Sequence, residues 1–346
     1  MIDNYPTFFN TEVELEEAIS RPTPEIVEMM KNLDGDFMFL GVAGKMGVSM
    51  SIMAKRACEL ADVNKKIIGV ARFSSEEKRE YLNKNGVETI KGDLLDQEFL
   101  NSLPDVDNIV YLAGMKFGTD GNESFTWAMN SYLPGLVAER FKKSRIIALS
   151  TGCVYPLVDV KSNGSIEEDI PAPVGEYAQS CLGRERLFEY GCLKNNTNVT
   201  LIRLNYSVEM RYGVLVDIAS KVYNEQSVDV TMGYANVIWQ GDANAMILKT
   251  LEHCTTEPTI FNISGTDIIS VREVAEKFGE LMNKEVTITG KEADTALLVN
   301  VNKAYKLLWK PKVSVEQILN WTAKWIEAKK PLLGKPTHFE VRDGKY

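Results

Sequence analysis

Residues 36–50 restrict the possible folds of this chain more than any other stretch; they read DFMFLGVAGKMGVSM. An apolar run, Phe37–Leu40, is followed by three glycines at regular spacing and then by a helix-compatible segment, Ser49–Leu60. A dinucleotide-binding βαβ unit requires this order of strand, glycine turn and helix, because the glycines let the backbone approach a pyrophosphate at the helix N-terminus. An ordinary strand-to-helix turn has the same pattern, so the glycines alone are a weak signal.

The candidate cofactor-binding residues of this stretch are Gly41, Gly44, Lys45, Met46 and Gly47. Another candidate follows the next expected strand, where an NAD site usually places a carboxylate for the adenosine ribose. No acid occurs there before Glu76, and Arg72 stands in its place. A guanidinium pairs well with a 2′-phosphate, so Arg72 favours NADP, with NAD as the alternative. The other interpretation is a solvated surface arginine.

Apolar, β-rich runs alternate with helix-compatible segments from residue 36 to residue 205. After Phe37–Leu40 the expected strands are Lys66–Ala71, Val87–Ile90, Asn108–Ala113, Arg145–Ser150 and Thr200–Leu204. The expected helices are Ser49–Leu60, Ser75–Asn85, Gln97–Leu103, Ser124–Lys142 and Gly175–Cys192. This alternation predicts an α/β fold, a doubly wound parallel sheet of Rossmann type, with ligands outside the carboxyl ends of the strands.

Three further parts flank this predicted domain. Residues 1–35 read as a helical extension that packs on it, with a proline near the start of the second helix. Residues 206–330 have a looser rhythm and predict a smaller α+β part that binds substrate, partly interleaved with the sheet. Residues 331–346 are polar and charged, and are either disordered or a strap across a cleft or a neighbouring subunit.

Charge and composition exclude several classes of function. The chain has 39 Lys and Arg against 48 Asp and Glu, a net charge of −9, which disfavours nucleic-acid and anionic-membrane partners. The five cysteines include no CxxC pair and there are only two histidines, so no metal site and no disulfide framework is expected. Without a secretion signal or a membrane-spanning run, we expect a cytoplasmic protein.

Further motifs occur in order along the chain, and together with the glycine stretch they resemble the extended short-chain dehydrogenases/reductases. The motifs are Gly92-Asp93-Leu94, Leu112-Ala113-Gly114, Asn130, the run from Ser150 to Tyr155, Tyr177-x-x-Ser180 and Arg203-Leu204-Asn205. Members of this family are NAD(P)-dependent epimerases, dehydratases and reductases. The resemblance implies adenine-side contacts by Asp93 and Leu94, and a loop from Leu112 to Gly114 that lies along the cofactor.

The resemblance further implies that Tyr177 is the catalytic acid/base and that Thr151 orients the substrate oxygen. A tyrosine hydroxyl has a pKa near 10, so such enzymes lower it with nearby positive charge. In the family this charge comes from a lysine four residues after the tyrosine, and here that residue is Cys181. A thiol cannot carry positive charge, so either another cation replaces the lysine or the chemistry is weakened.

Two cations are candidates for this replacement. Lys116 is preferred, because a loop residue at a strand end can reach the reaction centre. Arg184 lies on the same helix face as Tyr177, but is expected to face a partner helix or solvent. Cys181 itself is either a small packing residue or, in the sharper interpretation, a covalent nucleophile.

The candidate substrate-binding residues are Tyr206, Arg211 and Trp239, and for Trp239 core and interface packing is the preferred interpretation. The main hypothesis is an NAD(P)-dependent oxidoreductase or epimerase/dehydratase that acts on a sugar, a sugar acid or a nucleotide sugar. The alternative is a cofactor-binding sensor or assembly protein with little catalysis. Relatives commonly dimerise through the helices predicted here at 124–142 and 175–192, which implies a homodimer with Leu182, Leu187 and Phe188 at the contact.

Overall fold

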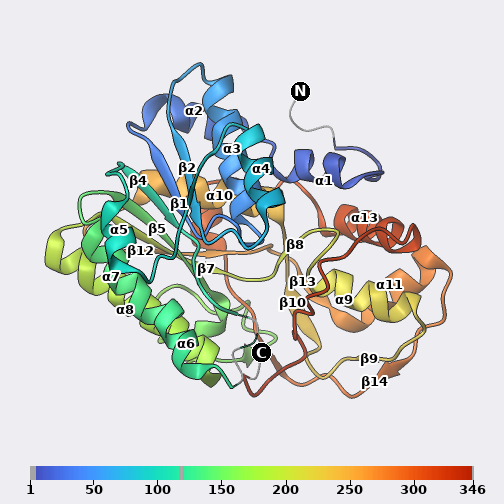
Figure 1. Ribbon diagram of the computed structural model, residues 1–346. Coiled ribbons are helices and arrows are strands. Elements are labelled where there is room, and N and C mark those ends of the chain that lie inside the picture. The colour runs from blue at the N-terminus through green and yellow to red at the C-terminus, as the bar shows by residue number, and fades with distance from the viewer. Residues whose placement is uncertain (1–4, 117, 119–120, 345–346) are drawn as a thin grey trace.

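The computed structural model describes residues 5–116, 118 and 121–344. At its centre is a seven-stranded sheet with the order β12-β7-β5-β4-β1-β2-β3, in which every neighbouring pair is parallel (Figure 1). Its strands are β1 (Phe37–Leu40), β2 (Ile67–Ala71), β3 (Glu88–Lys91), β4 (Asn108–Tyr111), β5 (Arg145–Thr151), β7 (Val199–Leu204) and β12 (Thr259–Ile263). The predicted doubly wound sheet of Rossmann type is therefore confirmed.

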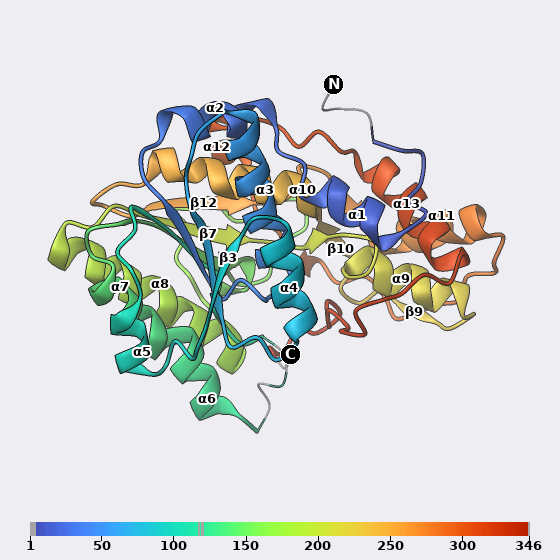
Figure 2. The same cartoon turned by 45° about the horizontal axis from the view of Figure 1, so that its top comes forward.

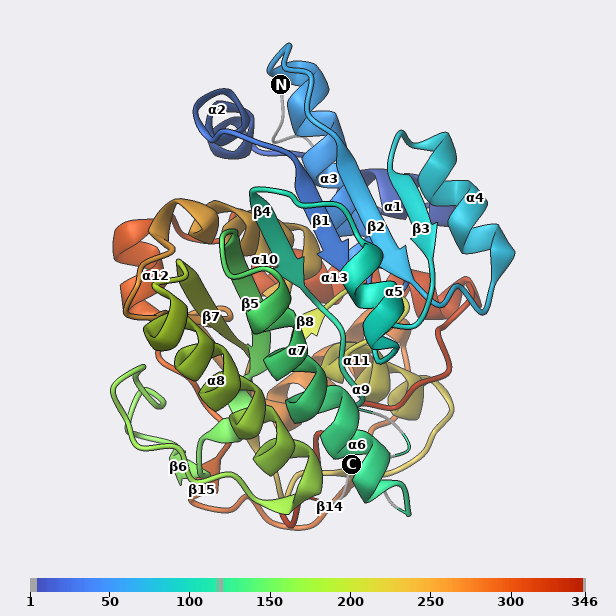
Figure 3. The same ribbon diagram turned by 60° about the vertical axis from the view of Figure 1, so that its left-hand side comes forward.

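Helices cover both faces of the sheet, and the side chains of β1 alternate between them. Phe37 and Phe39 belong to one core, and Met38 and Leu40 belong to the opposite one. The first core is closed by α2 (Pro24–Asn32), α3 (Gly47–Leu60) and α10 (Gln240–Lys249). The core on the opposite face of the sheet is closed by α5 (Gln97–Ser102), α7 (Leu133–Arg140) and α8 (Gly175–Asn195), which lie in front of the sheet in Figure 3. Burial on both sides explains why the central strands are unbroken apolar runs.

A second core unites the smaller part beside the sheet (Figure 1). Its helices are α1 (Glu12–Ile19), α9 (Val214–Tyr223), α11 (Val271–Met282) and α13 (Val315–Glu327). Short strands pair around it: β8 (Ser207–Val208) with β11 (Ile238–Trp239), β9 (Val228–Asp229) with β14 (Ile288–Thr289), β10 (Tyr234–Asn236) with β13 (Ile268–Ser270), and β6 (Val158–Asp159) with β15 (Thr295–Ala296). Two further α-helices are α4 (Glu76–Lys84) and α12 (Asn302–Leu307). Across the described residues, no helix has the length and apolarity to cross a bilayer.

The predicted helix 124–142 is not a single α-helix. It begins as α6 (Glu123–Trp127), widens into a π-helical turn at Ala128–Tyr132, and continues as α7. Pro134 follows this turn and has no N–H to donate to an α-helical hydrogen bond, which is compatible with the change of pitch. The π turn carries Asn130, and such turns are frequent at functional sites. Phe188, predicted at a subunit contact, is instead buried in the sheet core.

The C-terminal segment runs back from α13 past α9 toward the sheet (Figure 2). The amide of Leu333 donates to the carbonyl of Arg211 at 3.0 Å. Both the amide and the hydroxyl of Thr337 donate to Asp217, at 2.8 and 2.6 Å, and Phe339 is only 1% exposed in the second core. The described residues of this tail therefore form a strap that packs against the smaller part.

A buried ion pair joins α8 to the sheet beneath the strand ends. Glu185 accepts from Arg203 at 2.9 Å and from Ser150 at 2.6 Å, and both charged side chains are almost fully buried. We expect Glu185→Gln to lower the free energy of unfolding by about 3–5 kcal/mol in chemical denaturation, because it leaves a buried guanidinium without its counter-charge. The matched control is Arg186→Met, which breaks an exposed pair with Glu189 on the same helix and should cost less than about 1 kcal/mol. Equal losses in the two variants would contradict the prediction.

Candidate active site

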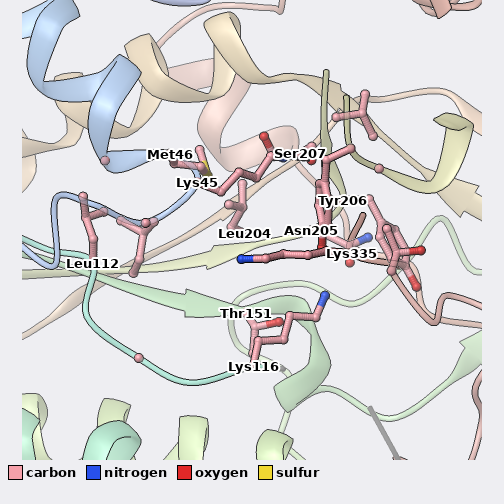
Figure 4. Close-up of a pocket in the computed structure, with 18 of the residues that line it drawn as sticks. Lys45, Met46, Leu112, Lys116, Thr151, Leu204, Asn205, Tyr206, Ser207 and Lys335 are labelled. Atoms are coloured by element: carbon pink, nitrogen blue, oxygen red, sulfur yellow. Dashed lines mark hydrogen bonds between the residues drawn. The ribbon is translucent and has the colours of Figure 1, made fainter. Parts of the chain in front are cut away.

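One pocket of about 550 Å³ opens at the carboxyl edge of the sheet. Its walls come from the glycine loop, the ends of β4, β5 and β7, the start of α8 and the C-terminal strap (Figure 4). The structure brings many of the predicted site residues together here: Gly44, Lys45, Met46, Gly47, Leu112, Gly114, Lys116, Thr151, Tyr177 and Tyr206. They meet because the carboxyl ends of parallel strands share one edge of the sheet.

The three glycines have different physical roles in the loop. Gly41 has a φ of +89°, and a Cβ on it would lie 2.6 Å from the amide nitrogen of Ala113. A Cβ on Gly47 would lie 2.4 Å from the carbonyl oxygen of Val42, so only glycine permits the close start of α3. Gly44 has ordinary φ, is exposed and faces the pocket. A bare backbone at a helix N-terminus suits a pyrophosphate, so the loop fits a dinucleotide.

Lys45 extends from the glycine loop toward the smaller part. Its Nζ donates to the carbonyl of Ser207 at 2.7 Å and lies 4.3 Å from the ring centre of Tyr212. Burial lowers the pKa of Lys45 to about 7, the charge of Glu209 opposes this, and the charges of Lys116 and Arg211 add to it. A bound anion would restore the proton to this amine.

The pocket is lined by positive side chains although the protein as a whole is acidic. Lys45, Lys78, Lys116 and Lys335 line it, while no carboxylate does so among the described residues. Sequence reasoning missed Lys78, which lies on α4 in a run of surface charges, and Lys335, which the strap carries to the pocket. A polar tail without periodicity offers no signal for Lys335; for Lys78 the nearby Arg72 was the only hint.

Tyr177 lies in the first turn of α8 and lines the pocket. It is 9% exposed and hydrogen-bonded to Thr151, whose own hydroxyl accepts from the amide of Cys153 at 3.1 Å. Burial raises the pKa of Tyr177 well above its ordinary value, and the thiols of Cys181 and Cys153 raise it further. The charge of Arg184 and the hydrogen bond to Thr151 act in the opposite direction.

Two cysteines flank this tyrosine, and they differ in access. Cys181 is fully buried and is not among the described residues that line the pocket. Burial raises the pKa of its thiol to about 11, which disfavours the thiolate that a nucleophile needs. The structure therefore argues against a nucleophilic Cys181 and for the packing interpretation. Cys153 does line the pocket and was not anticipated.

The placement of Arg184 differs from the expectation that it faces a partner helix or solvent. Its guanidinium is buried and donates to the carbonyl of Leu149 at 2.6 Å and to Oδ1 of Asn130 at 2.8 Å. Asn130 in turn holds the backbone of Met115 on both sides, each bond being 2.8 Å long. Arg184 therefore lies against the loop after β4. Lys116, which belongs to the same loop, lines the pocket.

The adenine-side candidates lie outside the pocket lining. Arg72 is exposed directly after β2, and Asp93 is exposed and accepts from the amide of Leu95 at 3.0 Å. Leu94 is buried in the sheet core, and Ala113 is buried with its backbone against Gly41. These positions leave Arg72 and Asp93 accessible to a ligand, whereas Leu94 acts through packing.

Two predicted substrate residues are engaged elsewhere. Arg211 forms ion pairs with Glu16 at 2.6 Å and with Glu209 at 3.1 Å, so its guanidinium ties α1 to the segment after β8. Trp239 is fully buried in the second core, with its ring 5.2 Å from that of Trp321. Neither is among the described pocket-lining residues, and the prediction that they clamp a substrate is therefore not supported.

Several solved structures that match this architecture are named as sugar-nucleotide enzymes. A dTDP-glucose 4,6-dehydratase from Bacillus anthracis in complex with NAD has a TM-score of 0.72 at 18% identity, covering 85% of this chain and 96% of that one. A UDP-glucose 4-epimerase from Thermotoga maritima with UDP-glucose has a TM-score of 0.69 at 19% identity, covering 85% and 99%. A UDP-glucuronic acid 4-epimerase from Bacillus cereus in complex with NAD has a TM-score of 0.70 at 16% identity, with the same coverage. At these identities the likeness shows the fold alone.

Sequence comparison addresses the family itself. No curated protein sequence matches the chain. The sequence model of the NAD dependent epimerase/dehydratase family, however, matches residues 42–263, more than half of the chain. Because that match runs from the glycine loop to the last strand of the central sheet, the chain belongs to the NAD-dependent epimerase/dehydratase family.

Proposed function

We propose that the protein is an NAD(P)-dependent oxidoreductase or epimerase/dehydratase acting on a sugar, a sugar acid or a nucleotide sugar. The observation that carries this proposal is the hydrogen-bonded pair of Thr151 and Tyr177, which lines the same pocket as the glycine loop. Tyr177 accepts a proton from a substrate hydroxyl in one direction and returns it in the other. Thr151 holds the same substrate oxygen. A bound nicotinamide supplies the hydride acceptor.

The cofactor proposed is NADP, with NAD as the alternative. The glycine loop and Lys45 would hold the phosphates, and Lys78 adds positive charge from α4. Arg72 is exposed at the carboxyl end of β2, where it is available to a 2′-phosphate. If this assignment is right, Arg72→Ala weakens NADP binding more than NAD binding in calorimetry, and equal losses would argue against it.

Binding of the dinucleotide should weaken as pH rises from about 7 to about 9. A phosphate favours protonated Lys45, and the pKa of this amine is about 7 in the free protein, so above that pH binding must take up a proton. Burial of this amine and the charges of Glu209, Lys116 and Arg211 together determine its pKa in the free protein. Calorimetry in buffers of different ionisation enthalpy measures the uptake, which Lys45→Met should abolish. An affinity of the wild type that is independent of pH would contradict the prediction.

The substrate side of the pocket supports an anionic ligand. Lys116 comes from the loop after β4 and Lys335 from the strap, and both line the pocket that also contains Tyr177 and Tyr206 (Figure 4). Two lysines here suit the diphosphate of a nucleotide sugar or the carboxylate of a sugar acid. Assembly as a homodimer through the α6–α8 face is part of the proposal, and light scattering at micromolar concentration checks it.

One observation favours the alternative, a cofactor-binding protein with little catalysis. Burial and two neighbouring thiols raise the pKa of Tyr177, and the residue one turn along the helix is Cys181 where relatives carry a lysine. Both functions predict cofactor binding, so only turnover separates them. A large gain of activity in Cys181→Lys would indicate a degraded site, and a loss would indicate a site arranged around the cysteine.

The test combines binding with a defined substrate panel. Calorimetry with NADP and NAD establishes cofactor binding. UDP-glucose, UDP-glucuronic acid and dTDP-glucose, the ligands or substrates named for structural neighbours, are then followed by reduced-nicotinamide absorbance and by NMR of the sugar products. Cofactor binding with turnover of a sugar substrate supports the enzyme. Binding without turnover across a wider panel of free sugars and sugar acids supports the alternative, and no dinucleotide binding contradicts both.

A further inference from the structure

Arg184 is a buried cation without a carboxylate partner. It is 7% exposed, and within the described part of the chain it forms no ion pair; it donates to neutral oxygens of Leu149 and Asn130 and lies 5.8 Å from the ring centre of Tyr111. Among the described residues, its Nε has no hydrogen-bond partner. The adjacent acid, Glu185, acts on Arg184 through its charge but is hydrogen-bonded by Arg203 and Ser150. A buried cation without an ion-pair partner is expensive, which points to a functional reason for its retention.

The surroundings of Arg184 are shaped to admit it. A Cβ on Gly114 would lie 2.4 Å from its Nη2, so the glycine of the loop after β4 leaves room for the guanidinium. The π turn before α7 presents Asn130 to the same nitrogen. Cys181 on the same helix is also fully buried, and the charge of Arg184 acts on its thiol. Gly114 and Asn130 therefore act together to place one cation.

Several elements present titratable groups to the Tyr177 hydroxyl. Cys181 shares its helix, Cys153 comes from the turn after β5, and both thiols disfavour the phenolate. Arg184 favours it, and also acts on the buried Tyr111 of β4. Lys116 lines the pocket from the loop. Glu185 affects the neighbouring thiol of Cys181 but is paired with Arg203.

We propose that Arg184 replaces the missing helix lysine as the positive charge that favours the Tyr177 phenolate. It is a positioning residue and not a catalytic one, because it does not line the pocket and acts through Tyr177. Lys116, by contrast, lines the pocket. This inference rests on the proposed function, since it assigns a charge to the acid/base of that reaction.

The decisive measurement reads Tyr177 directly and needs no substrate. Incorporating 3,5-difluorotyrosine at position 177 lowers the intrinsic pKa of the phenol, because fluorine withdraws electrons from the ring, and fluorine NMR then follows its ionisation. In the full-length protein we expect Arg184→Met to raise the titration midpoint by at least about one pH unit. Arg184→Lys, which keeps the charge, should stay within about half a unit of the parent. Arg186→Met on the exposed face of the same helix is the matched control and should leave the midpoint unchanged.

A second readout guards against a variant that folds poorly. Adding Cys181→Lys to Arg184→Met restores a cation one turn from Tyr177 and should return the midpoint toward the parent value. With a substrate in hand, Arg184→Met should reduce turnover at least tenfold near neutral pH and recover at alkaline pH, while KM changes little.

The outcomes separate this inference from the proposed function. If the titration midpoint of residue 177 is unchanged in Arg184→Met while the wild-type protein turns over a substrate, the inference is overturned and the proposed function stands. If Arg184→Met shifts the titration midpoint but the wild-type protein turns over no substrate, the proposed function is overturned and the electrostatic assignment stands.

Discussion

Replacing Tyr177 by phenylalanine is expected to reduce turnover by about 10²–10⁴-fold, the usual contribution of a positioned acid/base. The substitution removes only the hydroxyl that is bonded to Thr151 and keeps the buried ring in place. Cofactor affinity and thermal stability should therefore change little. Steady-state kinetics on the substrate found in the panel, together with calorimetry of dinucleotide binding, measure the two effects separately.

The control for this variant is Tyr190→Phe. Tyr190 is on the same helix but 62% exposed, so it tests the removal of a hydroxyl outside the site. It should leave turnover unchanged. Turnover in Tyr177→Phe equal to that of Tyr190→Phe would show that Tyr177 is not the acid/base, and attention would move to Thr151 and Lys116.

Gly44→Val is expected to weaken dinucleotide binding by about 100-fold, equivalent to about 2.8 kcal/mol. Gly44 faces the pocket with ordinary φ, and the nearest atom to an added Cβ is the carbonyl oxygen of Gly41 at 3.3 Å. A branched side chain there would occupy the space that a pyrophosphate needs, while the fold should tolerate it. Calorimetry with NADP and a thermal melt of the free protein test both parts.

Two further variants, Gly41→Ala and Gly135→Ala, serve as controls for Gly44→Val. Gly41 has positive φ and no room for a Cβ, so its substitution should destabilise the fold itself. Gly135 is in α7, where a Cβ would make an ordinary contact with Leu187 at 3.5 Å, so alanine should leave binding unchanged and favour the helix. If Gly44→Val binds the dinucleotide as tightly as Gly135→Ala, the glycine loop is not the cofactor site.

The sheet and its helices were largely predictable, in places to the residue. β1 has the bounds expected from the sequence, Phe37–Leu40. Strands buried on both faces need continuous apolar runs, so local patterns suffice for such strands. The π turn at Asn130 was missed because its hydrogen bonds, and not its side-chain periodicity, distinguish it from an α-helix.

The candidate site also contains residues that could be predicted from the sequence and residues that could not. Thr151, Tyr177 and the glycine loop were identified in advance, because each is a motif at a strand end or a helix start. Lys335 and the buried role of Arg211 were not, since an arginine looks the same in sequence whether it faces a ligand or another part of the fold. The partners that decide between these roles lie far along the chain, as Glu16 does for Arg211.

Local sequence thus accounts for a Rossmann-type domain, its glycine loop and a tyrosine acid/base candidate, because short-range periodicity and backbone freedom act within a few residues. The charge beside Tyr177 required the assembled fold. Arg184 reaches its site only because Asn130, 54 residues earlier, and Gly114 are brought against α8 by packing on a common sheet. Electrostatic energies depend on distance and burial in space, and neither can be read from the order of residues.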